Sequence, residues 1–348
     1  MRNLKLILSQ LVSVALISVV LSGSLTFITW LFWGRQAFID TELMSTIYAP
    51  EPIGVAHGVA EINSDVKNIF LIGSSNVREG FRPTILNQRL SDFTTSNFAI
   101  GASNIAQLYE TVGLVNHFLT PAGRQNAVYV VGIWYGQFVS NNKRWGPSGK
   151  TDLDNELQKF RLFTVNDFEL YPRVFMSHEV EVGYIRLFLP LIAAKRFMVY
   201  ARSLPIRMPY KGKIDDVFKA ESKKFWHDYM GTVDDSVDVE QFEYLHKMAS
   251  LIDKVGSKLI LVDMPIPNWH KNASAHNTDY QNRVLWRIEK LAKERQIAYL
   301  DMRSLETDGD FYDSAHPTSQ AAQYWSASLS HMITESMKAT GYVRLRID

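Results

Sequence analysis

Short apolar segments, each followed by a helical pattern, recur along this chain from residue 68 onward. Five of them are rich in β-branched or aromatic residues: Asn68–Gly73, Ser96–Gly101, Ala127–Trp134, Lys258–Pro265 and Ala298–Met302. Strands that are covered on both faces of a sheet have this composition, because neither face has to meet water. The segments therefore predict buried, parallel β-strands.

Helical patterns lie between or after these segments. Apolar residues recur at spacings of three and four in Asn104–Leu119, Glu240–Val255, Asp279–Arg295 and Thr318–Ala339. Alternating strands and helices predict an α/β fold, here a three-layer α/β/α sandwich around a five-stranded parallel sheet. In such a sheet, reactive groups gather in the crevice beyond the carboxyl ends of the strands.

The chain is 348 residues long, which is enough for one large core and an inserted subdomain. We expect the main domain to span 67–348. The third and fourth strand segments are too far apart for one crossover, which predicts a mostly helical insertion at about 140–235. Inside it, Tyr184–Lys213 carries seven Lys or Arg residues and no acidic residue, around the apolar run Leu187–Tyr200. Three interpretations stay open: contact with a membrane surface, binding of an acidic polymer, or a helical hairpin packed on the domain.

The N-terminal region differs from the rest of the chain. Leu6–Trp33 contains no charged residue, and it exceeds the roughly 20 residues that cross a hydrocarbon core. Arg2 and Lys5 precede it, which favours a cytoplasmic N-terminus. We therefore expect residues 1–35 to be a cytoplasmic stub and a transmembrane helix, followed by a connector at 36–66. This predicts a single-pass protein of the inner (cytoplasmic) membrane with its catalytic domain outside the cytoplasm. A cleaved signal peptide and a buried core helix are the alternatives.

The composition excludes several kinds of chemistry. The chain has no cysteine, so thiol catalysis, disulfides and Cys-ligated zinc are excluded. The formal net charge of +1 gives no global bias toward nucleic acid. His270, His276 and Asp263 lack the helical spacing of a metal site. We expect no metal, no cofactor and no nucleic-acid partner.

Three polar motifs follow predicted strands. Gly73-Ser74-Ser75-Asn76 comes directly after the first, and Ile100–Asn104, with Gly101, follows the second. Tyr312–Thr318 lies between the fifth segment and the last helix, with Asp313 three residues before His316. A carboxylate at this spacing can orient the imidazole ring and leave Nε2 free as a base. A glycine lets backbone approach a substrate oxygen closely.

These motifs, in this order and at these places, resemble the SGNH (GDSL) hydrolase family, which has a flavodoxin-like fold. The family's blocks are Gly-Asp-Ser after strand one, a glycine after strand two, and Asp-x-x-His-Pro before the last helix. The resemblance implies that Ser75 is the nucleophile, His316 the base and Asp313 its orienting group. It also implies that the backbone amides of Ser75 and Gly101 bind the oxyanion. The resemblance covers 67–139 and 240–340.

The chain departs from the family in two blocks. Ser74 replaces the block-one acid, as in membrane-anchored members that act on cell-surface polymers, such as proteins of polysaccharide O-acetylation or teichoic-acid D-alanylation. The third block, Gly-x-Asn-Asp, is replaced by Gly132–Phe138, so the third oxyanion donor stays open. The candidates for that donor are a backbone amide, Gln137, Asn104 and Asn76. The candidates for substrate binding, with core packing as the alternative, are Trp134, Tyr135 and Trp269.

The resemblance implies acyl transfer through an acyl-serine. We expect an esterase or acyltransferase that adds or removes O-acetyl or similar groups on an exported cell-surface polysaccharide. Its expected partners are that polymer, a membrane-embedded acyl exporter and membrane lipid. Two alternatives stay open: a non-catalytic assembly or binding protein of a polysaccharide export or modification complex, and a lipid esterase or thioesterase.

Overall fold

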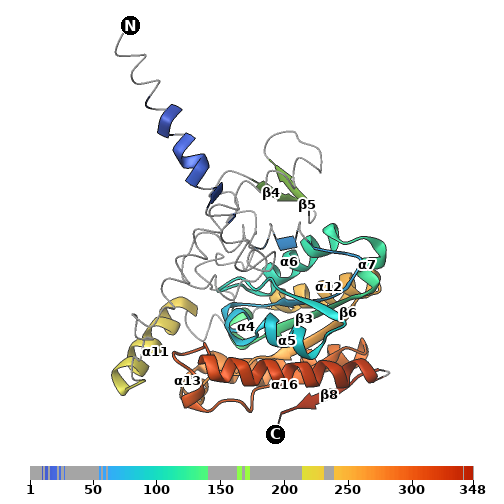
Figure 1. Ribbon diagram of the computed structural model, residues 1–348. Helices are drawn as coiled ribbons and strands as arrows, with labels where there is room; N and C mark the ends of the chain where they lie inside the picture. Colours follow the sequence, from blue (N-terminus) through green and yellow to red (C-terminus); the bar gives the residue numbers. More distant parts are fainter. Residues whose placement is uncertain are drawn as a thin grey trace.

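The computed structural model describes most of the predicted catalytic domain. It covers residues 62–139, 214–230, 239–339 and 341–347, the strand pair at 163–166 and 169–172, and scattered positions before residue 60. Within these ranges the chain forms an open parallel sheet covered by helices on both faces (Figure 1). Most of the connector at 36–66 lies outside the described residues, and so does the whole basic segment Tyr184–Lys213.

The sheet has six parallel strands in the order β2-β1-β3-β6-β7-β8. Their bounds are β1 Lys67–Ile72, β2 Phe93–Asn97, β3 Ala127–Ile133, β6 Lys258–Asp263, β7 Ala298–Asp301 and β8 Arg344–Arg346. All seven residues of β3 are buried, as are the last five of β1. Central strands packed between two helix layers need apolar side chains on both faces, which explains their unbroken hydrophobic sequences.

The helices form a layer on each face of the sheet. Their bounds are α4 Ser75–Gly80, α5 Pro83–Arg89, α6 Ile105–Phe118, α7 Pro121–Gln125, α11 Asp216–Met230, α12 Val239–Lys254, α13 Asn268–Ala273, α14 Ala275–Arg283, α15 Leu285–Glu294 and α16 Ser319–Lys338. Helices α6 and α12 pack together on one face, and α16 packs against α4 and α5 on the other (Figure 1). The predicted helix Asp279–Arg295 is two helices, which meet at Val284.

The predicted five-stranded sheet is wrong by one strand. β8 joins the edge of the sheet beside β7 and has only three residues, of which two are arginines. A short, charged edge strand carries no hydrophobic pattern, so the sequence gives little sign of it. Ion pairs hold it instead: Arg344 lies 3.0 Å from both Glu289 and Asp301. β2 also begins and ends earlier than the predicted segment Ser96–Gly101.

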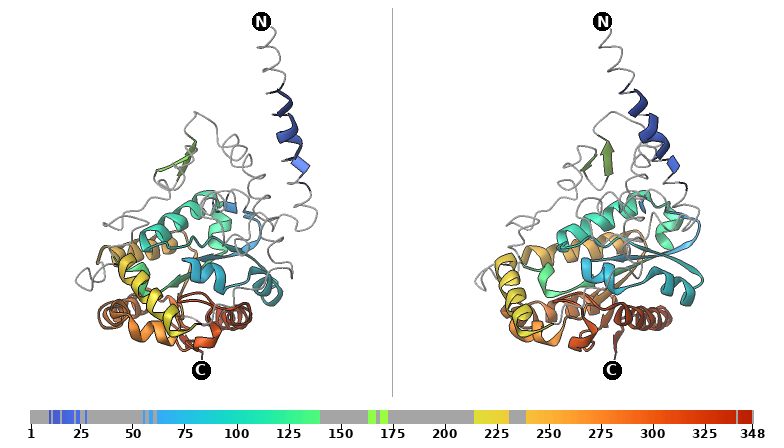
Figure 2. Two further views of the ribbon diagram at one scale, coloured as in Figure 1. Left: turned by 90° about the vertical axis from the view of Figure 1, so that its left-hand side faces the viewer. Right: turned by 60° about the vertical axis from the view of Figure 1, so that its left-hand side comes forward.

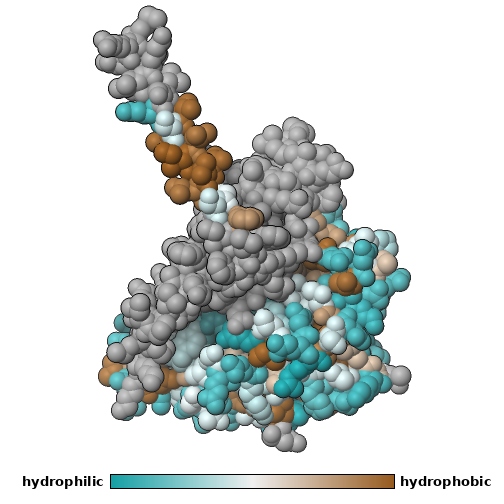
Figure 3. Space-filling view, in the orientation of Figure 1, coloured by the Kyte–Doolittle hydropathy of each residue, from teal (hydrophilic) through white to brown (hydrophobic). Residues whose placement is uncertain are grey.

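The predicted transmembrane helix is not found. A helix needs roughly 20 apolar residues to cross the hydrocarbon core. Among the residues that the structure describes, no helix is both long and apolar enough to do so. The helical positions described between residues 10 and 27 are exposed, and Figure 3 shows that most are hydrophobic. This finding contradicts the predicted span over Leu6–Trp33 and the single-pass inner-membrane placement that depended on it.

The described parts of the insertion are of two kinds. β4 (Phe163–Asn166) and β5 (Glu169–Pro172) form an antiparallel pair separate from the main sheet. Helix α11 lies apart from this pair and packs against α13 (Figures 1 and 2). The insertion therefore reaches the main domain through at least one helix.

Two glycines let α4 lie directly over the ends of β1 and β3. A Cβ atom on Gly132 would come 2.1 Å from Cγ2 of Val77, and one on Gly73 would come 2.2 Å from the same atom. Real Cβ atoms do not approach carbon so closely, so any larger residue would displace Val77. Because Val77 lies in the first turns of α4, the displacement would also move Ser75.

We expect Gly132→Ala to lower the free energy of unfolding by about 1–3 kcal/mol, because the methyl group overpacks the space that Val77 fills. Urea denaturation measures the effect. Gly309→Ala is the control, because a Cβ there meets no atom within 4 Å. Equal stability of the two variants would show that α4 does not pack as tightly on the sheet as the structure indicates.

Candidate active site

Ser75 begins α4 at the point where β1 ends. Ser74 is extended (φ −89°, ψ −167°), and its carbonyl accepts the amides of Val77 and Arg78 at 3.0 and 3.1 Å. The Ser74 hydroxyl donates to Oδ1 of Asn76 at 2.6 Å, within the turn. The Ser75 side chain instead points away from the turn, toward a loop near the C-terminus. The two adjacent serines thus have different roles in the structure.

Ser75, His316 and Asp313 form one hydrogen-bonded chain. His316 Nε2 lies 2.7 Å from Ser75 Oγ, and His316 Nδ1 lies 2.7 Å from Asp313 Oδ2. An ionised carboxylate only accepts hydrogen bonds, so Nδ1 carries the ring proton and Nε2 presents its lone pair to the serine hydroxyl. This is the tautomer that a general base for Ser75 requires.

Asp313 also shapes the loop that carries His316. Its Oδ1 accepts the backbone amides of Ala315 and His316, both at 2.8 Å, which closes a tight turn. Thr318 ends the loop: its amide donates to the Asp310 carbonyl at 2.7 Å, and its hydroxyl caps α16. One carboxylate therefore fixes both the backbone of the loop and the orientation of the imidazole.

Charges around the imidazole favour its protonated form. Burial by itself would lower the pKa of His316, but the hydrogen bond that its Nδ1 donates to Asp313 and the charge of Glu79 outweigh this effect and raise the pKa above its ordinary value. Burial alone would raise the pKa of Asp313. The hydrogen bond and charge of His316 overcome that effect, so this pKa is lowered. The pair is suited to take a proton from Ser75 and to stabilise the resulting imidazolium.

Tyr312 and Glu79 surround the imidazole, and the sequence analysis did not assign them. The Tyr312 ring stacks on His316 at 5.7 Å between centroids, with 18° between the planes. Its hydroxyl donates to the Glu79 carboxylate, which also pairs with Arg78 at 3.1 Å. Glu79 stands four residues after Ser75, one helical turn along α4, and that spacing is the signal that points to it.

The pKa of His316 predicts a pH profile. A general base works only when unprotonated, so kcat/KM for an ester should rise with pH through an ionisation that is shifted upward from that of a free histidine. Glu79→Gln removes a negative charge that favours imidazolium, so the rise should move to lower pH. Rates measured across pH with a chromogenic acetate ester test this. Glu335→Gln, on the exposed end of α16, is the charge-matched control and should leave the profile in place. An unmoved profile in Glu79→Gln would contradict the assigned electrostatics.

The loop after β2 is docked against the turn that carries Ser75. The Ile100 amide and the Ser103 hydroxyl both donate to the Gly73 carbonyl, at 3.0 and 3.1 Å. Gly101 is buried inside this loop, and Ala102 has the left-handed φ of 58°. Non-glycine residues at positive φ are strained and persist where surrounding contacts enforce them. The loop therefore holds the Gly101 backbone in a fixed place beside the start of α4.

The three candidate side-chain donors differ in what they already bind. Asn104 caps α6, since its side chain accepts the Gln107 amide at 3.0 Å. Gln137 is engaged at both ends, accepting from the Trp134 amide at 3.0 Å and donating to the Gly132 carbonyl at 3.4 Å. Asn76 Oδ1 accepts two hydrogen bonds, but its buried Nδ2 has no acceptor among the described residues. Asn76 is thus the candidate whose donor group is unused.

The chain matches no known protein family model. No curated protein matches it either. The assignment of function therefore depends on the geometry of the site.

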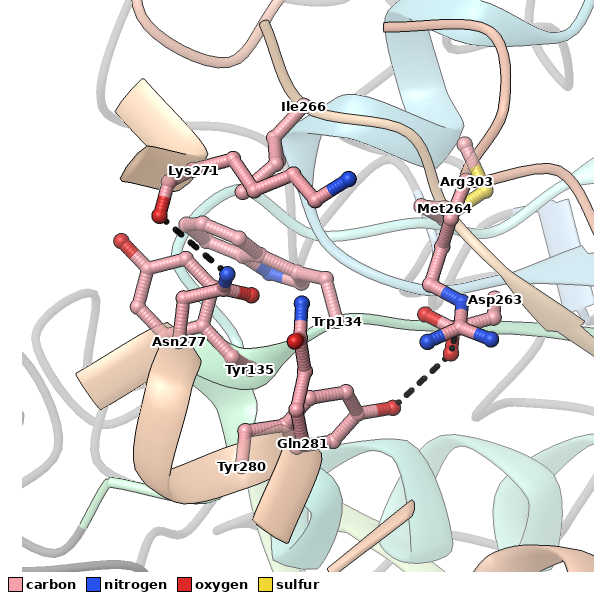
Figure 4. Close-up of a pocket in the computed structure, with 10 residues that line it drawn as sticks. All are labelled: Trp134, Tyr135, Asp263, Met264, Ile266, Lys271, Asn277, Tyr280, Gln281 and Arg303. Atoms are coloured by element: carbon pink, nitrogen blue, oxygen red, sulfur yellow. Dashed lines mark hydrogen bonds and ion pairs between the residues drawn. The ribbon is translucent and has the colours of Figure 1, made fainter. Parts of the chain in front are cut away.

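Trp134 and Tyr135 line a small pocket at the ends of β3 and β6 (Figure 4). Its floor holds Asp263, whose carboxylate accepts the hydroxyls of Tyr280 and Tyr299 and pairs with Arg303 at 3.2 Å. Burial raises the pKa of Asp263 to about 6, although Arg303 and the Tyr299 hydroxyl act against it.

Trp269 does not line this pocket in the structure. It stacks on His270, whose two ring nitrogens are both hydrogen-bonded within the protein. No group of three or more His, Asp or Glu residues in the described ranges is placed to hold a metal ion.

Proposed function

We propose that this chain is a serine esterase or O-acyltransferase of the SGNH type. The observation that carries the proposal is the chain of 2.7 Å contacts from Ser75 through His316 to Asp313. Ser75 is 241 residues from His316 in sequence, so the contact depends on the whole fold. A Ser–His–Asp chain at the carboxyl edge of a parallel sheet has the geometry of nucleophilic acyl transfer.

In the acylation step, His316 Nε2 takes the proton of Ser75 as Oγ attacks the carbonyl carbon of an ester. The negative charge that develops on the carbonyl oxygen is accepted by the backbone amides of Ser75 and Gly101. When the tetrahedral intermediate collapses, the bond to the leaving alkoxide breaks and His316 returns the proton to it. Ser75 then carries the acyl group as an ester.

In the second step, His316 takes a proton from water or from an acceptor hydroxyl as its oxygen attacks the acyl-Ser75 carbonyl carbon. The bond between that carbon and Ser75 Oγ then breaks, and His316 returns the proton to Oγ, which restores the free serine. Water completes hydrolysis, and a hydroxyl completes transfer. The resemblance to proteins that modify cell-surface polymers favours a polysaccharide hydroxyl and a small acyl group such as acetyl. The replaced third block favours a slower hydrolase, because loss of one oxyanion donor costs about 10²–10³ in rate.

A chromogenic acetate ester tests this proposal. We expect an initial burst of alcohol release and an acetyl group on Ser75, detected by mass spectrometry of quenched enzyme. Added oligosaccharide that becomes acetylated would assign transfer, and acetate release alone would assign hydrolysis. If the folded protein releases no alcohol and carries no acetyl group, the catalytic proposal fails and the non-catalytic binding protein is favoured.

A further inference from the structure

His270 is a buried histidine outside the Ser–His–Asp chain, and it contacts the loop that carries that chain. It is 3% exposed, and its Nδ1 lies 2.5 Å from the carbonyl oxygen of Ser314. A carbonyl oxygen only accepts hydrogen bonds, so Nδ1 must carry the proton and donate. Nε2 is then an acceptor, and it lies 2.6 Å from the Tyr135 hydroxyl. Both ring nitrogens are thus hydrogen-bonded, and Nδ1 is the one that binds the loop.

Helix α11 holds the same residue of the loop. Trp226, on α11, donates from Nε1 to the Ser314 hydroxyl at 2.8 Å. Its indole also stacks on His270, at 5.5 Å between centroids and 25° between planes. Trp269 from α13 stacks on His270 as well, at 5.6 Å and 28°. The aromatic contacts place α11, α13 and the loop in one cluster.

Ser314 lies directly after Asp313 and two residues before His316. Its carbonyl and its hydroxyl are each bound by a residue from outside the loop, His270 and Trp226. The loop's internal hydrogen bonds set its shape. Contacts with other elements set its position: these two from α13 and α11, and those of Tyr312 and His316 with α4. A loop displaced by about 1 Å can cost on the order of 10² in rate, because acyl transfer depends on the alignment of the base with the serine.

We propose that His270 and Trp226 are positioning residues of the acyl transfer, and that helix α11 of the insertion thereby completes the active site. The inference rests on the proposed function, since it assigns a role in that reaction. Neither residue needs to touch the substrate. Both act through Ser314 on the position of the loop, and so on the distance between His316 Nε2 and Ser75 Oγ.

The proposal has a signature in the pH profile. Asp313 holds the pKa of His316 up through its hydrogen bond, Glu79 adds to this through its charge, and Arg78 acts against both. Tyr312 is stacked on the imidazole. Displacing the loop moves His316 away from α4 and weakens the effect of Glu79, which is larger than the opposing effect of Arg78, so the pH dependence moves toward lower pH. A general loss of stability lowers the amount of active enzyme at every pH and leaves the profile unmoved.

The experiment measures the rate at which a fluorophosphonate modifies Ser75, as a function of pH, in variants of the full chain. His270→Phe keeps a ring but loses both hydrogen bonds, and we expect labelling to slow about 100-fold, with the profile moved to lower pH. Trp226→Phe keeps a stacked ring and loses one hydrogen bond, so about 10-fold is expected. His270→Asn should recover part of the rate, because Asn Nδ2 can replace Nδ1 as donor to Ser314.

The controls separate the possible failures. Ile288→Val removes a buried methylene in α15 and should leave the profile unmoved. If His270→Phe labels at the wild-type rate and with the wild-type profile, the positioning role is wrong while the proposed function stands. A slower rate with an unmoved profile, or no difference between His270→Asn and His270→Phe, also overturns it. Absence of labelling in the wild-type protein would instead contradict the proposed function.

Discussion

Ser75→Ala should lower kcat/KM for an acetate ester by about 10⁴-fold or more. The variant has no hydroxyl to attack the carbonyl carbon, so no acyl-enzyme can form. Triad members act as a unit, and what remains is the contribution of binding and of the oxyanion donors. Steady-state rates with a chromogenic ester measure the loss, and thermal denaturation checks that the variant is folded.

Ser74→Ala is the matched control for Ser75→Ala. The Ser74 hydroxyl is bound to Asn76 inside the turn, so its loss should affect the packing of α4 more than the chemistry. We expect the rate to fall by less than about 10-fold, in keeping with the loss of one internal hydrogen bond. A larger loss in Ser74→Ala than in Ser75→Ala would move the nucleophile to Ser74.

Asp313→Asn should lower kcat/KM by about 10⁴-fold, and His316→Ala by a comparable amount. Asn Oδ1 can still accept the amides of Ala315 and His316, so the turn is kept. The amide nitrogen, however, donates toward Nδ1, which forces the ring proton onto Nε2 and leaves Ser75 without a base. Asp313→Ala removes the turn contacts as well, so it is the less informative variant.

The double variant Ser75→Ala/His316→Ala gives a second test of this chain. Its rate should be close to that of Ser75→Ala alone, because the base has no function once the nucleophile is gone. The same chromogenic ester measures all four rates in the cycle. Additive losses in the double variant would indicate that the two residues act independently.

The central strands were predictable because burial on both faces leaves a clear composition. Four of the five predicted segments begin within one residue of an observed strand, as at Ala127 in β3 and Lys258 in β6. β8 was not predicted, because an edge strand held by arginine ion pairs has no hydrophobic pattern. The predicted transmembrane helix over Leu6–Trp33 was wrong, since no helix among the described residues is long and apolar enough to cross a membrane.

The three residues of the hydrogen-bonded chain were predictable because each follows a recognisable position: the end of a strand, or the turn before the last helix. The residues that contact this chain and its loop were not predictable. Glu79 meets Tyr312 across 233 residues, and Trp226 meets Ser314 across 88. Such contacts depend on tertiary packing: the spacing of Glu79 from Ser75 places both on one side of α4, but nothing in the sequence pairs Glu79 with Tyr312. Gln137 and Asn104 were candidates by type, and only the structure shows that local caps and turns already engage them.

The central claim is that Ser75 is an activated nucleophile. Mass spectrometry of peptides from the full chain, after reaction with a fluorophosphonate, tests it most directly. The account predicts one adduct, on Ser75, which is absent in Ser75→Ala and forms far more slowly in His316→Ala. An adduct on Ser74, or no adduct on any serine of the folded protein, would contradict it.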